Sequence, residues 1–366
     1  MSEWKKVKLG EIANIKTGKL DSNAAVTNGL YPFFTCDPNT LRINEWAYDT
    51  EAVLLAGNNA SGNYTAKYYI GKFNAYQRTY IIESSNTFVT STRFLAYAMN
   101  MQLQRLKVMS SGSTTKFITM KMLTSLEIPH PSIETQHRIA TILSRYDSLI
   151  ENYLKQIKLL EEAAQRLYKE WFVELRFPGH ENTKMVDGLP EGWERKKLVD
   201  VAKLKAGGDK PKAFSNEKTE ELTVPVFSNG TVNEGLYGYT NVAEVNEPSV
   251  TVSARGSIGF TVMRRMPYVP IVRLISIIPI NVYIGYLYLY IKGMPLDGNG
   301  AAQQQITVPM IKDIVILMPS NLILKMFEEN VEPLYIIAET LKNQIRLLTE
   351  ARDRLLPRLM GGKMEV

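Results

Sequence analysis

The sequence predicts an α+β fold with a pseudo-two-fold internal repeat: two similar mixed α/β domains, each followed by a long helix. The first observation is a pair of matching openings, in which WKKVKLGEIANIKTG at 4–18 returns as WERKKLVDVAKLKAG at 193–207. The match continues downstream, at 112–131 with 300–319 and at 156–163 with 344–351. A period of roughly 190 residues is too long for a solenoid and indicates a duplicated domain. A duplicated chain is expected to meet two similar features in its partner.

Each repeat divides into an irregular part and a regular part. The irregular parts carry short β-rich runs, such as EAVLL at 51–55 and SVTVS at 249–253, separated by Gly, Asn and Ser clusters. That texture is typical of a mixed α/β domain with long loops. The predicted boundaries are a first domain at 1–131, a helical region at 132–178, a linker at 179–192, a second domain at 193–319 and a second helical region at 320–361.

Both helical regions carry the same heptad seam, in which apolar residues step alternately by four and three. The seam of the first region is Tyr146, Ile150, Tyr153, Ile157, Leu160, Ala164, Leu167 and Trp171. The seam of the second is Leu334, Ala338, Leu341, Ile345, Leu348, Arg352, Leu355 and Leu359. The repetition predicts that the two helices pair as a coiled coil.

Local signals predict where these helices begin and end. Ser144 and Asp147 resemble a capping box, and the aligned Pro333 suits a first helical turn. The patterns fade near 177–179 and 357–362. About 26 helical residues span roughly 40 Å, close to one turn of B-DNA at about 34 Å. If the helices pair antiparallel, they are expected to hold the domains about one DNA turn apart.

Composition limits the class of protein. The 366 residues are 45% hydrophobic and 22% charged, which suits a globular chain with more than one core. A net charge of +6 and a pI near 9.0 suit a polyanion such as nucleic acid. Cys36 is the single cysteine, and with three histidines it makes a Cys/His zinc site improbable. Together with a polar, basic start, this predicts a reducing cytoplasmic location.

One uncharged run, 274–291, approaches the length of a membrane-spanning helix, about 20 residues. Pro279 and Asn281 interrupt it, and the corresponding run 80–97 contains charged residues. We therefore expect a buried strand followed by a helix, with a membrane span as the alternative.

Signatures of catalysis are missing from the sequence, which contains no GxGxxG, GxxxxGK[ST], HExxH or GxSxG pattern. The Asp37-Pro38-Asn39-Thr40 segment resembles the loop of amino-methyltransferases, but it lacks the second proline and the aromatic residue, so a turn is expected. Asp187 with Glu194-Arg195-Lys196 suggests a metal nuclease only faintly, because Asp187 falls in the predicted linker. The chain is expected to bind no metal or cofactor of its own.

Paired glycine-rich loops are the positive signal. GNNASG at 57–62 takes the place of ARGSIG at 254–259, and SSGSTTK at 110–116 that of NGAAQQ at 299–304. Small residues let a backbone approach phosphates, while Asn, Gln, Arg, Ser and Thr supply donors for base edges. Plain turns are the alternative. With lysines from the basic start of each repeat, the DNA-binding candidates are Asn58, Asn59, Ser61, Ser113, Thr114, Thr115, Lys116, Lys16, Arg255, Ser257, Lys205, Gln303 and Gln304.

The first helical region ends in the aromatic segment YKEWFV at 168–173. This is more aromatic surface than one partner helix needs, so we expect another subunit to cover it, through Tyr168, Trp171 and Phe172.

The chain resembles the specificity subunits of type I restriction-modification systems, along essentially its whole length. The most specific motifs are QHRIA at 136–140, LYKEWFV at 167–173 with FPG at 177–179, GLPEGW at 188–193, and EARDRLLPRLM at 350–360. The resemblance implies two target-recognition domains that each read one half of a split, asymmetric DNA site, held apart by two antiparallel conserved helices. It also implies that Gln136 and Arg138 contact a partner subunit. The second copy departs from the pattern, because it lacks a QHRI-like helix start and reads ILKMF at 323–327.

The resemblance further implies a chain without catalysis of its own. Such a chain recruits two methyltransferase subunits, which use S-adenosylmethionine, and two restriction subunits, which use ATP and Mg. Two other classes are kept as alternatives: an enzyme with fused recognition domains, which the missing motifs disfavour, and a coiled-coil scaffold that binds no DNA.

Overall fold

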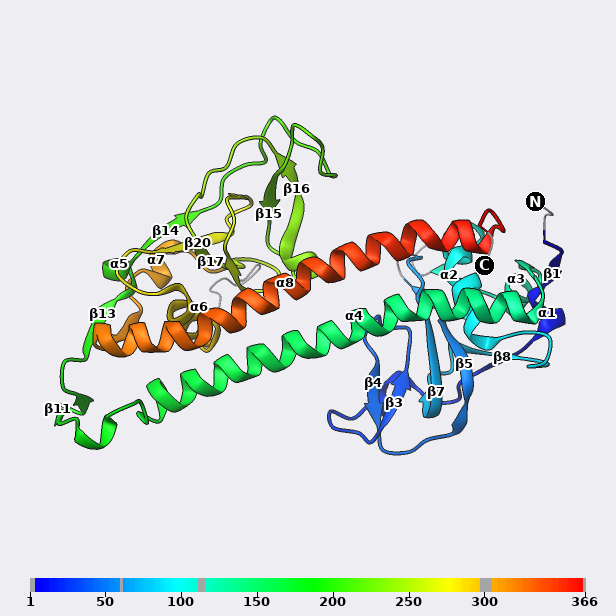
Figure 1. Ribbon diagram of the computed structural model, residues 1–366, viewed down its shortest axis with the longest axis horizontal. Helices are drawn as coiled ribbons and strands as arrows, with labels where there is room; N and C mark the ends of the chain where they lie inside the picture. The colour runs from blue at the N-terminus through cyan, green and yellow to red at the C-terminus, as the bar shows by residue number, and fades with distance from the viewer. Residues whose placement is uncertain (1–3, 60–61, 111–115, 297–304, 365–366) are drawn as a thin grey trace. The chain divides into compact units, whose positions relative to one another are not determined.

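The computed structural model describes residues 4–59, 62–110, 116–296 and 305–364 (Figure 1). The chain forms two compact units, each with its own α/β domain and part of both long helices. Unit 1 comprises 1–154 and 343–366, and unit 2 comprises 155–342. The boundary between the units therefore falls inside the two long helices, α4 (Ile133–Tyr168) and α8 (Asn321–Met360).

Unit 1 is built on a mixed sheet of six strands in the order β2-β8-β5-β7-β3-β4 (Figure 1). Its core lies between this sheet and α2, where strand and helix residues such as Val53, Ile82 and Phe94 are fully buried. The elements are β1 (Lys6–Lys8), α1 (Leu9–Ile12), β2 (Ala13–Thr17), β3 (Tyr31–Phe34), β4 (Leu41–Ile43), β5 (Tyr48–Ala56), β6 (Asn58–Asn59), β7 (Ala66–Ala75), β8 (Thr79–Ser84), α2 (Thr92–Met109), β9 (Lys116–Phe117), α3 (Met120–Thr124) and β10 (Glu127–Pro129).

Unit 2 has the same chain path with two smaller sheets, β14-β20-β17-β18 and β16-β15-β19 (Figure 1). The elements are β11 (Met185–Val186), β12 (Leu189–Pro190), β13 (Glu194–Lys197), α5 (Leu198–Val201), β14 (Ala202–Ala206), β15 (Val224–Phe227), β16 (Leu236–Thr240), β17 (Ser249–Val252), β18 (Thr261–Arg264), β19 (Val269–Pro270), β20 (Ile275–Pro279), α6 (Ile284–Lys292), α7 (Val308–Ile311) and β21 (Val315–Met318).

Strand pairing confirms the duplication. In both units the opening strand pairs antiparallel with the strand before the long helix, β1 with β10 and β13 with β21. In both units one strand joins an antiparallel neighbour on one side and a parallel neighbour on the other, β3 in unit 1 and β15 in unit 2. The continuous β7 corresponds to β18 plus β19, which are separated at Pro267. Proline lacks the N–H that a ladder needs, so the single sheet of unit 1 is divided in unit 2.

The predicted helix starts are wrong. Helix α4 begins at Ile133, after Ser132, whose hydroxyl accepts from the Thr135 N–H at 3.3 Å. Ser144 lies inside the helix, and its hydroxyl donates to the Thr141 carbonyl at 3.2 Å. A Ser-x-x-Asp pattern can cap a helix or lie within one, because the serine can bond back to an earlier carbonyl. Sequence alone did not separate the two cases.

Pro333 also lies inside its helix, because α8 begins at Asn321. A proline within a helix removes one hydrogen bond, at a cost of about 3 kcal/mol. Val331 and Tyr335 are buried on either side of Pro333, and their packing offsets that cost. The helices have 36 and 40 residues, so each is about 54 to 60 Å long rather than the 40 Å expected.

The heptad seams are confirmed. Every seam residue of both helices is buried or half-buried. In unit 1, Asp147 of α4 accepts from Arg352 of α8 at 2.8 Å, and in unit 2 the ring of Tyr168 of α4 lies 6.3 Å from that of Phe327 of α8. Numbering rises along one helix as it falls along the other, so the helices are antiparallel.

Two further expectations have clear outcomes. The 274–291 run is a buried strand, β20, followed by a helix, α6, as predicted. Within the described parts of the chain, none of the helices combines the length and hydropathy of a membrane span.

The predicted linker is more ordered than expected, since β11 and β12 form a hairpin whose turn residues Asp187 and Gly188 have φ of 49° and 75°. Asp-Gly suits that left-handed turn.

Candidate nucleic-acid interface

In unit 1, the two predicted loops meet in a short strand pair. Strand β6 pairs antiparallel with β9, placing Asn58 opposite Phe117 and Asn59 opposite Lys116. The Ile118 N–H donates to the Gly57 carbonyl at 2.8 Å and closes the same ladder. The side-chain oxygen of Asn58 is buried without a hydrogen-bond partner in the described part of the chain. Such atoms are uncommon in folded proteins, so this position is a candidate for contact with a ligand.

In unit 2, the equivalent loops are joined by a side chain. The Nε and Nη2 groups of Arg255 donate to the same oxygen, Oε1 of Gln305, at 3.1 and 2.9 Å. Arg255 is a predicted candidate, but the second predicted loop ends at Gln304, one residue before the side chain that Arg255 contacts. The signal that was available is the alignment itself, because Gln305 takes the place of Phe117.

One backbone hydrogen bond is common to both sites. The Ile306 N–H donates to the Ala254 carbonyl at 2.9 Å, as the Ile118 N–H does to Gly57. Two positions therefore differ in side chain on a shared frame: 58 and 117 in unit 1, and 255 and 305 in unit 2. A conserved frame with changed side chains is what two related readers of different sequences require.

Two lysines lie beside the unit 1 loop. The Lys107 ammonium donates to the Asn63 side chain at 2.7 Å. A Cβ placed on Gly62, whose φ is 72°, would lie 3.0 Å from Lys116 and 3.2 Å from Lys107. The positive charge concentrated there suits a phosphate. Lys107 was missed from sequence because it belongs to the preceding helix, α2.

The remaining loop candidates have separate outcomes. Ser257 is exposed in a turn in which its carbonyl accepts from the Phe260 N–H at 3.1 Å. Ser61, Ser113, Thr114, Thr115, Gln303 and Gln304 lie outside the described residues.

The two strand lysines are engaged by carboxylates. Lys16 on β2 lies 2.8 Å from Glu83, and Lys205 on β14 lies 2.8 Å from Glu244. The side chains of Lys16, Lys205 and Glu244 are each more than 40% exposed, so these ion pairs are weak. Each lysine can therefore exchange its carboxylate partner for a phosphate. Contact of Lys16 and Lys205 with DNA stays a prediction.

The segments weighed for catalysis have plain structural roles. The Asn39 N–H donates to the Asp37 side chain at 2.7 Å, which confirms the turn. Glu194 on β13 pairs with Lys196 at 3.0 Å. In the described ranges, no three His, Cys, Asp or Glu side chains gather in a way that could hold a metal ion.

The expectation that a further subunit covers the aromatic segment is wrong for most of it. Trp171 and Phe172 are only 7% and 6% exposed within this chain. Phe172 packs against Tyr286 and Phe327 at ring distances of 4.7 and 4.8 Å, and Tyr168 lies in the same cluster. The chain's own core in unit 2 accounts for these rings, because the α4 end supplies apolar surface to the second domain.

Gln136 is likewise an internal residue and not an exposed contact. Its side chain accepts from the Ser91 N–H at 2.9 Å and donates to the carbonyls of Val89 and Pro131 at 3.1 and 2.9 Å. Three bonds at a fully buried position explain why the motif needs glutamine there. Arg138 is exposed, and its contact with a partner stays a prediction.

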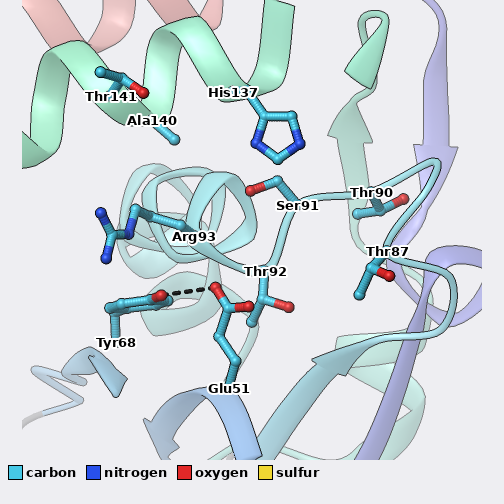
Figure 2. Close-up of a pocket in the computed structure, with 10 residues that line it drawn as sticks. All are labelled: Glu51, Tyr68, Thr87, Thr90, Ser91, Thr92, Arg93, His137, Ala140 and Thr141. Carbon is cyan, nitrogen blue, oxygen red and sulfur yellow. Dashed lines mark hydrogen bonds between the residues drawn. The ribbon is translucent and has the colours of Figure 1, made fainter. Parts of the chain in front are cut away.

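A polar pocket of about 250 Å³ opens in unit 1 beside the start of α2. Figure 2 shows Arg93, Tyr68 and Glu51 at one side of it and His137 of α4 at another. Tyr68 donates to Glu51 at 2.7 Å, and burial, with this bond, raises the pKa of the Tyr68 hydroxyl. The Arg93 guanidinium lies 4.8 Å from the Tyr68 ring centre. Tyr68, Glu51 and Arg93 thus contact one another at this side of the pocket.

Known proteins share this architecture. A crystal structure of a type I restriction-modification S subunit from M. genitalium matches with a TM-score of 0.63 and 17% identity, covering 97% of this chain and 96% of that one. It supports the fold. The EcoDI specificity subunit of Escherichia coli is 35% identical over 57% of this chain, which spans about half of that protein, 52%. A putative type I specificity subunit of Mycoplasma pneumoniae is 28% identical over 90% of this chain and 89% of its own length.

A protein-family model, the type I restriction modification DNA specificity domain, matches this sequence at residues 1–162 and again at 190–347. The two matches follow the two repeats and together cover most of the chain. With two α/β domains on paired antiparallel helices, the chain belongs to the family of type I restriction-modification DNA specificity proteins.

Proposed function

We propose that this chain is the DNA-recognition subunit of a type I restriction-modification complex and that it reads a bipartite, asymmetric site. Unit 1 reads one half through the β6–β9 region, and unit 2 reads the other through Arg255 and its neighbours. The observation that carries the proposal is the shared backbone frame with different side chains at positions 58, 117, 255 and 305. A shared backbone contact suits the common shape of DNA, and different side chains suit different bases.

The partners follow from the family. The chain would recruit two methyltransferase subunits, which bind S-adenosylmethionine, and two restriction subunits, which use ATP and Mg. The chain itself would be non-catalytic and cytoplasmic. Arg138, exposed near the start of α4, is a candidate contact for a methyltransferase subunit.

Methylation of a random DNA library tests the proposal. The full chain assembled with its methyltransferase subunits should methylate adenines within one split motif, while the chain alone should transfer no methyl groups. Sustained methyl transfer by the chain alone would favour the fused-enzyme alternative.

A salt titration separates DNA recognition from a pure scaffold. Affinity for duplex DNA should fall linearly on a log–log plot, with a slope of about −0.9 for each phosphate neutralised. A complex whose DNA affinity does not change when this chain is left out would support the scaffold and contradict recognition by the chain.

A further inference from the structure

We infer that Arg255 reads a guanine in the half-site of unit 2, and that Gln305 is the positioning residue that sets its geometry. The inference rests on the proposed function and adds the base that one residue reads. Its basis is the forked contact in which Nε and Nη2 of Arg255 share one oxygen of Gln305, at 3.1 and 2.9 Å.

The guanidinium has two edges that can donate a pair of parallel hydrogen bonds. Gln305 occupies the edge formed by Nε and Nη2. The other edge, formed by one hydrogen of each Nη, keeps the spacing that matches O6 and N7 of guanine. An arginine held along its side edge therefore presents its end edge in a fixed plane. Because the partner is an amide and not a carboxylate, it places no negative charge beside the Arg255 guanidinium.

The backbone on both sides of this contact is fixed as well. The Ala254 carbonyl accepts from the Ile306 N–H at 2.9 Å, which ties the chain next to Arg255 to the chain next to Gln305. The Ala254 N–H donates to the side chain of Asn229 at 2.7 Å, and that amide in turn donates to the Val272 carbonyl at 2.7 Å. Arg255 itself is half-buried. Its rotamer is thus ordered before DNA arrives, which lowers the entropy cost of binding.

Unit 1 provides the internal comparison. At the equivalent positions it carries Asn58 and Phe117, which share a strand pair but have no guanidinium to orient. A different base preference is therefore expected from unit 1. A change at Arg255 or Gln305 should alter one half-site and leave the other intact, whereas Asn58→Ala should do the reverse.

Selection from a randomised duplex library tests this with the full chain assembled with its methyltransferase subunits. Bound DNA is sequenced for the unchanged chain and for Arg255→Lys, Gln305→Met and Asn58→Ala. Lysine keeps the charge but not the fork, so Arg255→Lys should lower the preference for guanine at one position by about 5- to 150-fold. Gln305→Met keeps the length of the side chain and removes the acceptor. It should lower the same preference by about 2- to 12-fold, with the salt slope unchanged.

The outcomes separate the inference from the function on which it rests. A wild-type complex that enriches no sequence would overturn the proposed function. A selective complex whose guanine preference is unchanged by Arg255→Lys would overturn the inference alone, and uniform weakening with a shallower salt slope in an Arg255→Ala variant would assign Arg255 to a phosphate. If Gln305→Met fails to fold, as judged by circular dichroism, Gln305→Glu takes its place. That change holds the fork but neutralises it, so guanine preference should fall there too, and an unchanged preference would contradict a neutral positioning role.

Discussion

The two units carry out the same packing task with different chemistry at the start of their long helices. In unit 1 the buried side chain is Gln136, which hydrogen-bonds a loop, and in unit 2 the aligned residue is Leu324, which packs in an apolar core. Both helices begin alike, since the N–H of each of these residues donates to a serine carbonyl at 3.0 Å. A duplicated frame therefore accepts either a satisfied polar network or an apolar contact, but not half of a network.

The two units also differ in which helix of the packed pair carries a charged residue. Unit 1 places Arg93 near the start of α2 and Ala140 on α4, and the pocket of Figure 2 lies between them. Unit 2 has Gly285 at the start of α6 and Glu328 on α8, and a Cβ on Gly285 would lie 2.6 Å from the Glu328 carboxylate. The small residue and the charged residue have changed places. The same helix pair therefore accommodates the charged side chain on either helix when the facing residue is small.

The largest effect is expected at the helix ends. Phe172, in the π-helix Lys169–Val173 that continues α4, aligns with Met360 on α8, and each is buried in the core of its unit. Phe172→Ala should lower the free energy of unfolding of unit 2 by about 3–5 kcal/mol, because it removes a ring in contact with Tyr286 and Phe327. Met360→Ala should lower that of unit 1 by about 2–5 kcal/mol. Hydrogen exchange resolved by residue measures each unit separately. Loss of partner binding without loss of stability would restore the idea that Phe172 is an interface residue.

Exchanging the helix-start residues should have the next largest effect. Gln136→Leu copies unit 2 into unit 1 and leaves the Ser91 N–H and two carbonyls buried without partners. A cost of about 2–4 kcal/mol is expected in chemical denaturation of unit 1. Gln136→Glu keeps the acceptor for the Ser91 N–H but replaces the donating amide with a second acceptor oxygen, so it should recover the Ser91 contact only. If Gln136→Leu leaves the free energy of unfolding of unit 1 unchanged, then the loop, and not the glutamine, holds the helix start.

Much of the fold could be predicted because the two copies share their apolar and glycine positions. The heptad seams depend on periodicity, and the duplication depends on residues common to both copies. The prediction of a strand and then a helix at 274–291 depends on the residues that interrupt that run. The helix starts could not be predicted from local signals. Ser144 and Pro333 fit a first turn, but packing of residues such as Val331 extends the helix past them.

The site was predictable only to the level of loops. Arg255 and Asn58 became candidates because glycine-rich segments align in the two copies. Gln305 and Lys107 did not, because their contacts span 50 and 44 residues of sequence. The aromatic segment was misread for the same reason. An apolar surface identified in sequence does not say whether its cover lies in another chain or in a distant part of its own chain.

A smaller effect is expected at the one charged position of the seams. Arg352 donates to Asp147 at 2.8 Å, and Tyr97 donates to the other oxygen of that carboxylate at 2.5 Å. Arg352→Ala should cost unit 1 about 1–2 kcal/mol, reduced by the partial exposure of both side chains, 28% and 34%. Arg352→Met retains the apolar stem and should recover part of the loss. Losses that are the same at high and at low salt would indicate that the charge contributes little.

The smallest expected effect is a pH dependence of stability that is confined to unit 2. Burial raises the pKa of Glu328, so its ionisation favours the unfolded state, and the stability it allows at acid pH is lost as the pH rises through the raised value. One turn away, the bond from Arg265 lowers the pKa of Glu332. The contribution of Glu332 to the stability of unit 2 is therefore present above the unfolded pKa and is lost as the pH falls.

Glu328→Gln should therefore stabilise unit 2 on the order of 1 kcal/mol near pH 8 and hardly at all near pH 4. Glu332→Gln should destabilise it near pH 8, with the difference from wild type also closing in acid. Unit 1, with Ala140 in place of Glu328, has no corresponding carboxylate, so its denaturation profile should stay unchanged in both variants. Two variants that shift in the same direction near pH 8 would contradict opposite roles for these neighbouring carboxylates.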